Sequence, residues 1–210
     1  MRKAFLALIF AALLAAPASA QVCAGTASFA SGGLQLTGAV SFSDNSRLYG
    51  AGVALGGATG FYGAGAIGRR ETDGADATTV FGGTVGFALG HEVQICPSVT
   101  ASREVYSAIG ALKPTVDVIG GGLSLGGLAH VTPAFDVAPA ISVHRLHATA
   151  TASVGAYSAS ASTDYTVIGV ALGFVIGQRF TLQPAFAVPV GLEGAKTAFS
   201  IGVSLNVGKR

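Results

Sequence analysis

The sequence contains no tryptophan, a single methionine and few charged residues. Charged side chains make up 10% of the 210 residues, whereas an ordinary soluble domain carries roughly 25%. Apolar residues nevertheless make up 50% of the chain. A folded protein with so few charges and so many apolar side chains would have a poorly soluble surface, which argues against an ordinary soluble domain.

Beyond the first twenty residues, the sequence lacks any apolar run long enough to predict a membrane-spanning helix. The N-terminus itself has a basic start at Arg2 and Lys3, the apolar run "AFLALIFAALLAA" and a small-residue site, "ASA", that ends at Ala20. This pattern predicts a secretory signal peptide over residues 1–20, because the run is shorter than the roughly 20 residues of a spanning helix. Lipidation of Cys23 is not expected, because "AQVC" lacks a small residue directly before the cysteine.

Removal of the signal peptide leaves 190 residues that carry ten basic and ten acidic side chains, because Arg2 and Lys3 are lost. The mature chain therefore has no formal net charge. Since it also has no basic stripe, a nucleic-acid partner is not expected. A neutral, exported, apolar chain without spanning helices is best explained by β-structure in a membrane.

The stretch "FTLQPAFAVPVGL" at 180–192 alternates strictly between large apolar residues and small or mildly polar ones. Such alternation predicts a strand with one apolar face. About ten segments show it, with eight strands as the alternative count. The predicted strands cover residues 34–42, 47–55, 61–70, 79–89, 92–102, 116–128, 131–147, 165–176, 180–192 and 197–207.

The links between these segments alternate between tight turns and more polar connections. Tight turns are predicted near Gly57, Gly90, Gly127 and Gly177, and the two longest polar connections cover residues 103–115 and 149–164. Short periplasmic turns and longer outside loops are typical of an outer-membrane barrel. An even number of strands places both termini on the periplasmic side.

These patterns predict an all-β fold: a closed antiparallel up-and-down transmembrane β-barrel over residues 34–210, after an N-terminal periplasmic segment at 21–33. Closure is required because every backbone polar group in hydrocarbon must be paired. A soluble β-sandwich is the alternative, but its outer faces would carry charges rather than Gly, Ala, Ser and Thr. The prolines inside the predicted strands conflict with an uninterrupted sheet, and the one near mid-strand, Pro139, has no explanation in the sequence. These prolines are Pro97, Pro133, Pro139, Pro184 and Pro189.

The closing runs "FVIGQRFTLQPAFAVPVGL" and "AFSIGVSLNVG", together with the signal peptide and the glycine-rich strands, resemble the small outer-membrane β-barrel proteins with OmpA/OmpX-like barrel domains. The resemblance covers the mature chain. It implies location in a bacterial outer membrane, contact with its lipid, assembly by the barrel assembly machinery and a structural or adhesive role. This chain departs from the family's usual aromatic last residue, because it ends in "NVGKR".

Two cysteines in an exported chain predict a disulfide between Cys23 and Cys96, since the periplasm is oxidising. Alternation places Cys96 on the lumen face near a periplasmic turn, and Cys23 precedes the first strand. Two cysteines without a nearby pair of histidines do not predict a metal site. The glycine pattern "GAGAIG" at 63–68 does not predict a dinucleotide site, because no helical segment follows it.

Alternation also assigns Asp136, His144 and Gln183 to the lumen face. Asp136 is expected to need a basic partner on a neighbouring strand. Ser142, His144 and Asp136 share a face and could in principle form a hydrolase set, but same-face neighbours recur in every strand.

The expected function is a non-enzymatic envelope-structural or surface-interaction role of a monomer with an unidentified surface ligand and no cofactor. A narrow passive pore is the first alternative and an outer-membrane hydrolase the second.

Overall fold

The computed structural model describes Cys23 and residues 33–57, 60–90, 93–108, 110–177 and 179–207. The signal peptide predicted at 1–20 lies outside the described residues, as does all of the predicted periplasmic segment except Cys23 and Gly33. Both therefore stay predictions. Over the described ranges, no helix is long and apolar enough to cross a membrane.

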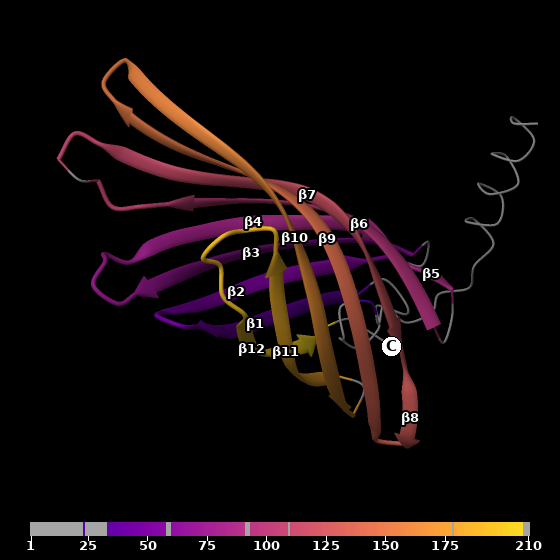
Figure 1. Cartoon of the computed structure of the whole chain (residues 1–210). Helices are drawn as coiled ribbons and strands as arrows, with labels where there is room; N and C mark the ends of the chain where they lie inside the picture. The colour runs from indigo at the N-terminus through magenta and orange to yellow at the C-terminus, as the bar shows by residue number, and fades with distance from the viewer. Residues whose placement is uncertain are drawn as a thin grey trace, which may run out of the picture.

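Antiparallel strands joined mostly by hairpins form one sheet that closes on itself (Figure 1). The strands are β1 (Gly33–Ser43), β2 (Ser46–Gly56), β3 (Phe61–Thr72), β4 (Thr78–Phe87), β5 (Leu89–Gly90), β6 (Val93–Val105), β7 (Lys113–Gly127), β8 (Ala129–Thr132), β9 (Phe135–Val154), β10 (Tyr157–Ile176), β11 (Phe180–Val190) and β12 (Ala198–Asn206). Closure comes from the pairing of β1 with β12 and of β9 with β10. The barrel has ten strands, as predicted, because the short β5 and β8 continue β4 and β7.

Proline explains why β4 and β7 are each interrupted. Gly86 pairs with Ser98, and Leu89 pairs with Ile95. Leu89 is three residues after Gly86, and Ile95 is three residues before Ser98, so the register is the same on both sides of the gap. Pro97 lies in that gap. Since proline has no N–H to donate, the ladder loses pairs there without any shift. The same relation holds between β7, β8 and β9, where the gap contains Pro139.

The remaining strand prolines are accommodated in related ways. Pro184 lies in a third gap, between the pairs Ala171–Ala185 and Phe174–Leu182 of β10 and β11, again with no change of register. Pro133 lies in the turn before β9, outside any strand. Pro189 stays in register opposite Val167. The prolines therefore interrupt single ladders locally and leave the closed sheet intact.

The long outside connection predicted at 149–164 is almost entirely strand, so that prediction was wrong. The connection predicted at 103–115 lies between β6 and β7, and its described residues from Tyr106 to Leu112 belong to neither strand. β9 runs to Val154 and β10 starts at Tyr157, with Gly155 in a left-handed conformation at the turn (φ 57°). Beyond the membrane both faces of a strand meet water. The apolar alternation that marks a strand in sequence is therefore lost, while backbone pairing continues.

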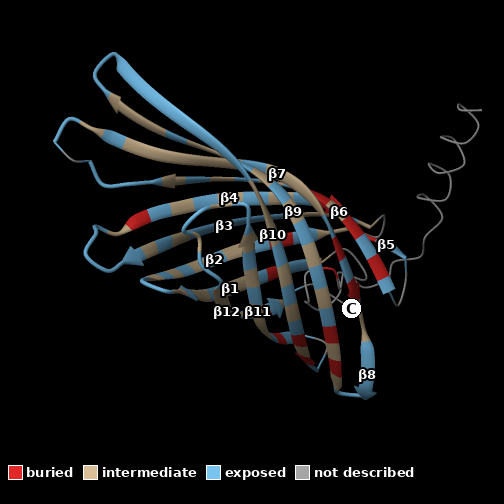
Figure 2. Ribbon diagram, viewed as in Figure 1, coloured by how far each residue is buried: buried red, intermediate tan, exposed pale blue. Residues whose placement is uncertain are grey.

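The predicted assignment of faces is confirmed by the exposure of the side chains. Large apolar residues point outward: Phe186 is 55% exposed and Ile67 60% exposed. The inward residues are small or polar, and Thr181 and Cys96 are fully buried. Buried residues gather mainly in the half of the barrel where β5 and β8 lie (Figure 2). The bulky apolar belt is thus on the outside of the barrel.

Two adjacent residues of β10 test this assignment. We expect Val170→Arg to destabilise the barrel by about 2–4 kcal/mol in lipid, because it places a charge in the apolar belt. Ala171→Arg, whose side chain enters the lumen cavity, should cost much less. Urea unfolding in lipid vesicles measures both, and equal losses would contradict the assignment.

Candidate functional site

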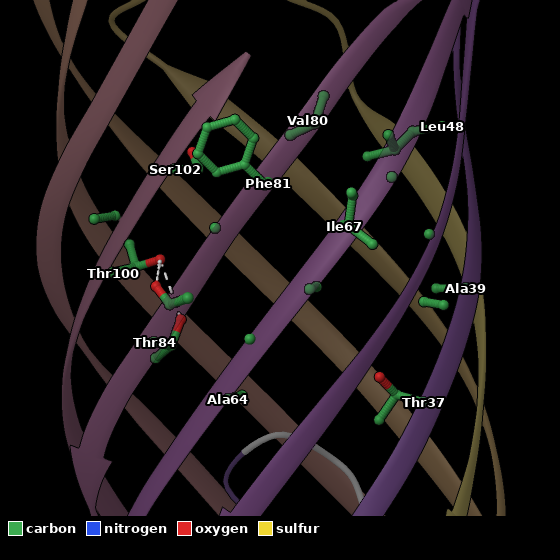
Figure 3. Close-up of a pocket in the computed structure, with 18 of the residues that line it drawn as sticks. Thr37, Ala39, Leu48, Ala64, Ile67, Val80, Phe81, Thr84, Thr100 and Ser102 are labelled. Carbon is green, nitrogen blue, oxygen red and sulfur yellow. Dashed lines mark hydrogen bonds between the residues drawn. The ribbon is translucent and has the colours of Figure 1, made fainter. Parts of the chain in front are cut away.

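The lumen contains two adjoining cavities of about 360 and 460 Å³. Thr37, Ala64 and Thr84 line both of them, so the cavities share a wall. The first is lined mainly by Gly, Ala, Ser and Thr, and the hydroxyl of Thr84 donates to that of Thr100 at 3.1 Å (Figure 3). The space exists because the inward residues are small, as the sequence alternation indicated.

The end of the lumen near β5 carries a disulfide between Cys23 and Cys96, with Cα atoms 5.9 Å apart, as predicted. Cys23 is 6% exposed and packs in a buried cluster with Ala88, next to Tyr62. Cys23 also lines the larger cavity together with residues of several strands. The disulfide therefore holds this N-terminal residue within the barrel end.

The outer end of the lumen carries an ion pair that the sequence did not reveal. Arg70 Nε of β3 donates to Glu104 Oε1 of β6 at 2.9 Å, and the Thr78 hydroxyl of β4 donates to the same oxygen at 2.5 Å. The Glu104 side chain is only 14% exposed. Just beyond β6, burial raises the pKa of Tyr106, and the negative charge of Glu104 adds a smaller increase. Charge is thus concentrated at the mouth rather than along the lumen.

The three predicted lumen residues face inward but do not form one site. Asp136 is 7% exposed and is hydrogen-bonded to His130 Nδ1 at 2.7 Å, the kind of neighbouring-strand partner that the sequence led us to expect. His144 lines the larger cavity, and a Cβ on Gly122 would lie 2.7 Å from its Cγ, so glycine is needed there. Gln183 lies beside Gly202.

The Ser142–His144–Asp136 set considered for a hydrolase is not assembled. Asp136 lies eight residues from His144 along β9, which corresponds to roughly 26 Å of strand. Among the described residues, His144 Nδ1 is buried without a hydrogen-bond partner. The carboxylate that would orient a catalytic histidine is instead bound to His130.

A row of polar side chains lies on the outer surface of the barrel just above the apolar belt. The Arg103 guanidinium donates two hydrogen bonds to Asp117, at 2.5 and 2.8 Å. Farther round, Asp164 of β10 contacts His147 of β9 at 2.8 Å, and Arg145 Nη2 lies 3.9 Å from the same carboxylate. The row marks the upper limit of the surface that lipid can cover.

A closed sheet whose apolar outer face ends at a polar row is suited to a lipid bilayer, because hydrocarbon requires every backbone group to be paired. The chain is a β-barrel of the outer-membrane type. The predicted location in a bacterial outer membrane is therefore confirmed.

Solved structures with a similar arrangement are outer-membrane proteins. The N-terminal β-barrel domain of Pseudomonas aeruginosa OprF is 14% identical with a TM-score of 0.42, over 84% of this chain and 98% of that one. Ail, the attachment invasion locus protein of Yersinia pestis, is 11% identical with a TM-score of 0.45, over 83% and 97%. KdgM porin is 11% identical with a TM-score of 0.41, over 81% and 98%.

No protein-family model and no curated protein matches the sequence. At the identities and TM-scores of the similar structures, no activity, ligand or partner carries over to this chain.

The disulfide should contribute measurably to stability. It closes a loop with a sequence separation of 73 residues, and a cross-link of that span lowers the entropy of the unfolded chain enough to stabilise the folded protein by about 4 kcal/mol. We expect Cys96→Ser to lower the urea midpoint of the oxidised protein. Reductant should lower the midpoint of the wild type to a similar value and leave that of the variant unchanged, and a wild type insensitive to reductant would contradict the prediction.

Proposed function

We propose that the protein is a surface-interaction barrel that binds extended polypeptide segments along the free outer edge of β10. The β10–β11 register ends at the pair Thr166–Val190, whereas β10 stays paired with β9 as far as Tyr157. Over the described residues, Tyr157–Tyr165 thus has no neighbouring strand on the β11 side. This free edge, visible on the long projecting hairpin in Figure 1, supports the proposal.

The free edge has none of the usual protection against strand pairing. Its sequence, "YSASASTDY", has no lysine and no proline, and Asp164 is its single charge. Native edges are commonly blocked by lysine, proline or a bulge. Small side chains from Ser158 to Thr163, all exposed, leave room for a strand to approach the backbone.

The chemistry of the edge selects an extended peptide as the partner. Alternating N–H and C=O groups are matched by another β-strand, and side chains on alternate faces then set specificity. A second barrel in the same membrane fits poorly. The two-fold axis of such a dimer would lie along the membrane normal. Edge strands that are tilted by about 35–45° in the two barrels would then cross each other rather than align. The partner is therefore a segment presented from outside the cell surface.

Two substitutions directly opposite each other in the β9–β10 ladder, Ser160→Lys and Thr151→Lys, test the proposal. Both add one lysine to the outer face, but only Ser160 lies on the free edge. We expect peptides selected by the wild-type barrel in nanodiscs from a random decapeptide library to bind Ser160→Lys roughly tenfold more weakly, about 1.4 kcal/mol. Binding to Thr151→Lys should stay near wild type.

Hydrogen exchange supplies the second readout for the edge. Bound peptide should slow the exchange of amides between residues 157 and 165. Failure to select any peptide, or protection elsewhere in the barrel with none at this edge, would exclude the proposed function.

A narrow passive pore is the second candidate, supported by the two adjoining lumen cavities. The disulfide at one end and the Arg70–Glu104 pair at the other narrow the path. We expect small conductance steps in planar bilayers that increase when Glu104→Ala removes the ion pair. The absence of steps in both proteins would eliminate the pore.

A further inference from the structure

Four side chains on the outer face of β9 and β10 form one continuous hydrogen-bonded chain. Asp164 Oδ1 lies 2.8 Å from His147 Nδ1, and His147 Nε2 lies 3.4 Å from Thr149 Oγ1. Thr149 Oγ1 lies 3.0 Å from Ser162 Oγ. When Nδ1–H donates to the carboxylate, Nε2 is left as an acceptor for the threonine hydroxyl.

The order carboxylate, imidazole, hydroxyl is the order needed to activate a hydroxyl as a nucleophile. Asp164 orients the ring, and the ring can remove the proton of Thr149. Two pairs on the same face of the β9–β10 ladder position the groups, because His147 is directly opposite Asp164 and Thr149 is directly opposite Ser162. The paired backbone thus holds the set without a loop.

The location of this set points to a lipid substrate. Ile119 of β7, 56% exposed on the outer face, lies directly opposite His147. Four residues farther down β9, Val143 faces Ile168 of β10 in the apolar belt. The hydroxyl of Thr149 is therefore at the upper boundary of the lipid-covered surface, near the level of the ester groups of outer-leaflet lipids.

A cation beside the set favours lipids with an anionic headgroup. Arg145 is 64% exposed, and its nearest approach to Asp164 is a loose 3.9 Å. One of its nitrogens, Nη1, donates to Thr166 at 3.3 Å. The remaining N–H groups of the guanidinium are positioned to meet a lipid phosphate at the same height.

We propose that Thr149, His147 and Asp164 form a hydrolytic site for acyl esters of phosphate-bearing lipids. Thr149 Oγ attacks the ester carbonyl carbon while His147 Nε2 takes the hydroxyl proton. The bond to the leaving alcohol breaks, and the alcohol takes that proton from Nε2. Water, deprotonated by the same nitrogen, then cleaves the acyl–threonine ester, which releases a carboxylic acid and restores Thr149.

This activity goes beyond peptide binding and uses different groups. It depends on side chains of the outer face, whereas peptide binding depends on the free backbone of β10. The two proposals can therefore fail separately.

The test uses the purified barrel in mixed micelles of detergent and dioleoylphosphatidylglycerol, with released oleate measured by mass spectrometry. We expect Thr149→Val and His147→Gln each to reduce the rate by about 100-fold or more, since a positioned base contributes roughly 10²–10⁴. Thr149→Ser should retain activity. The matched control is Thr151→Val, which lies two residues farther out than Thr149 on the same face of β9 and should leave the rate unchanged.

An acyl adduct provides a readout on the folded wild type alone. Rapid quenching with p-nitrophenyl butyrate should place a butyryl group on Thr149, detected by peptide mass. No oleate release above the His147→Gln level, or an adduct on any other residue, would overturn the proposal.

Discussion

Pairing of backbone N–H and C=O groups in a medium without water is the constraint on which this structure depends. Each unpaired group in hydrocarbon costs several kcal/mol, so the sheet must close, as β1 and β12 do. In the closed sheet, the residues of every strand then point alternately outward and inward. Bulk goes outward because lipid accepts it, and small residues go inward because a ten-stranded lumen is narrow.

This division explains why so much of the fold could be predicted. The alternation of Phe186 and Val188 with Ala185 and Ala187 records the two environments directly, and it held wherever lipid covered the strand. Outside the membrane, the alternation of large apolar and small residues disappears. The segment "TASVGAYSASASTD" is small and polar on both faces, so its sequence resembles a loop although it forms a hairpin. The sequence indicated that the strand prolines conflict with an uninterrupted sheet. It could not show which pairs are lost at Pro97, Pro139 and Pro184, because that depends on which strand faces the missing N–H.

The candidate sites were harder to predict than the fold. His144 was singled out because it shares a strand face with Ser142, but its Nδ1 has no hydrogen-bond partner in the described part of the chain. His147 received no role, although it meets Asp164 across the ladder. Such contacts depend on which rung faces which, and the length of the β9–β10 turn sets that register. A predicted loop of sixteen residues (149–164) left the register undefined, so neither the His147 pair nor the free edge of β10 could be inferred.

The covalent link between Cys23 and Cys96 also constrains biogenesis. The segment between them contains β1 to β5. If oxidation precedes insertion, these strands reach the membrane as a tethered ring whose two ends cannot separate. Strand-by-strand insertion from the N-terminal side is then impossible, and the early hairpins must enter the membrane together. The later hairpins are then added to a segment that the disulfide has already closed into a ring.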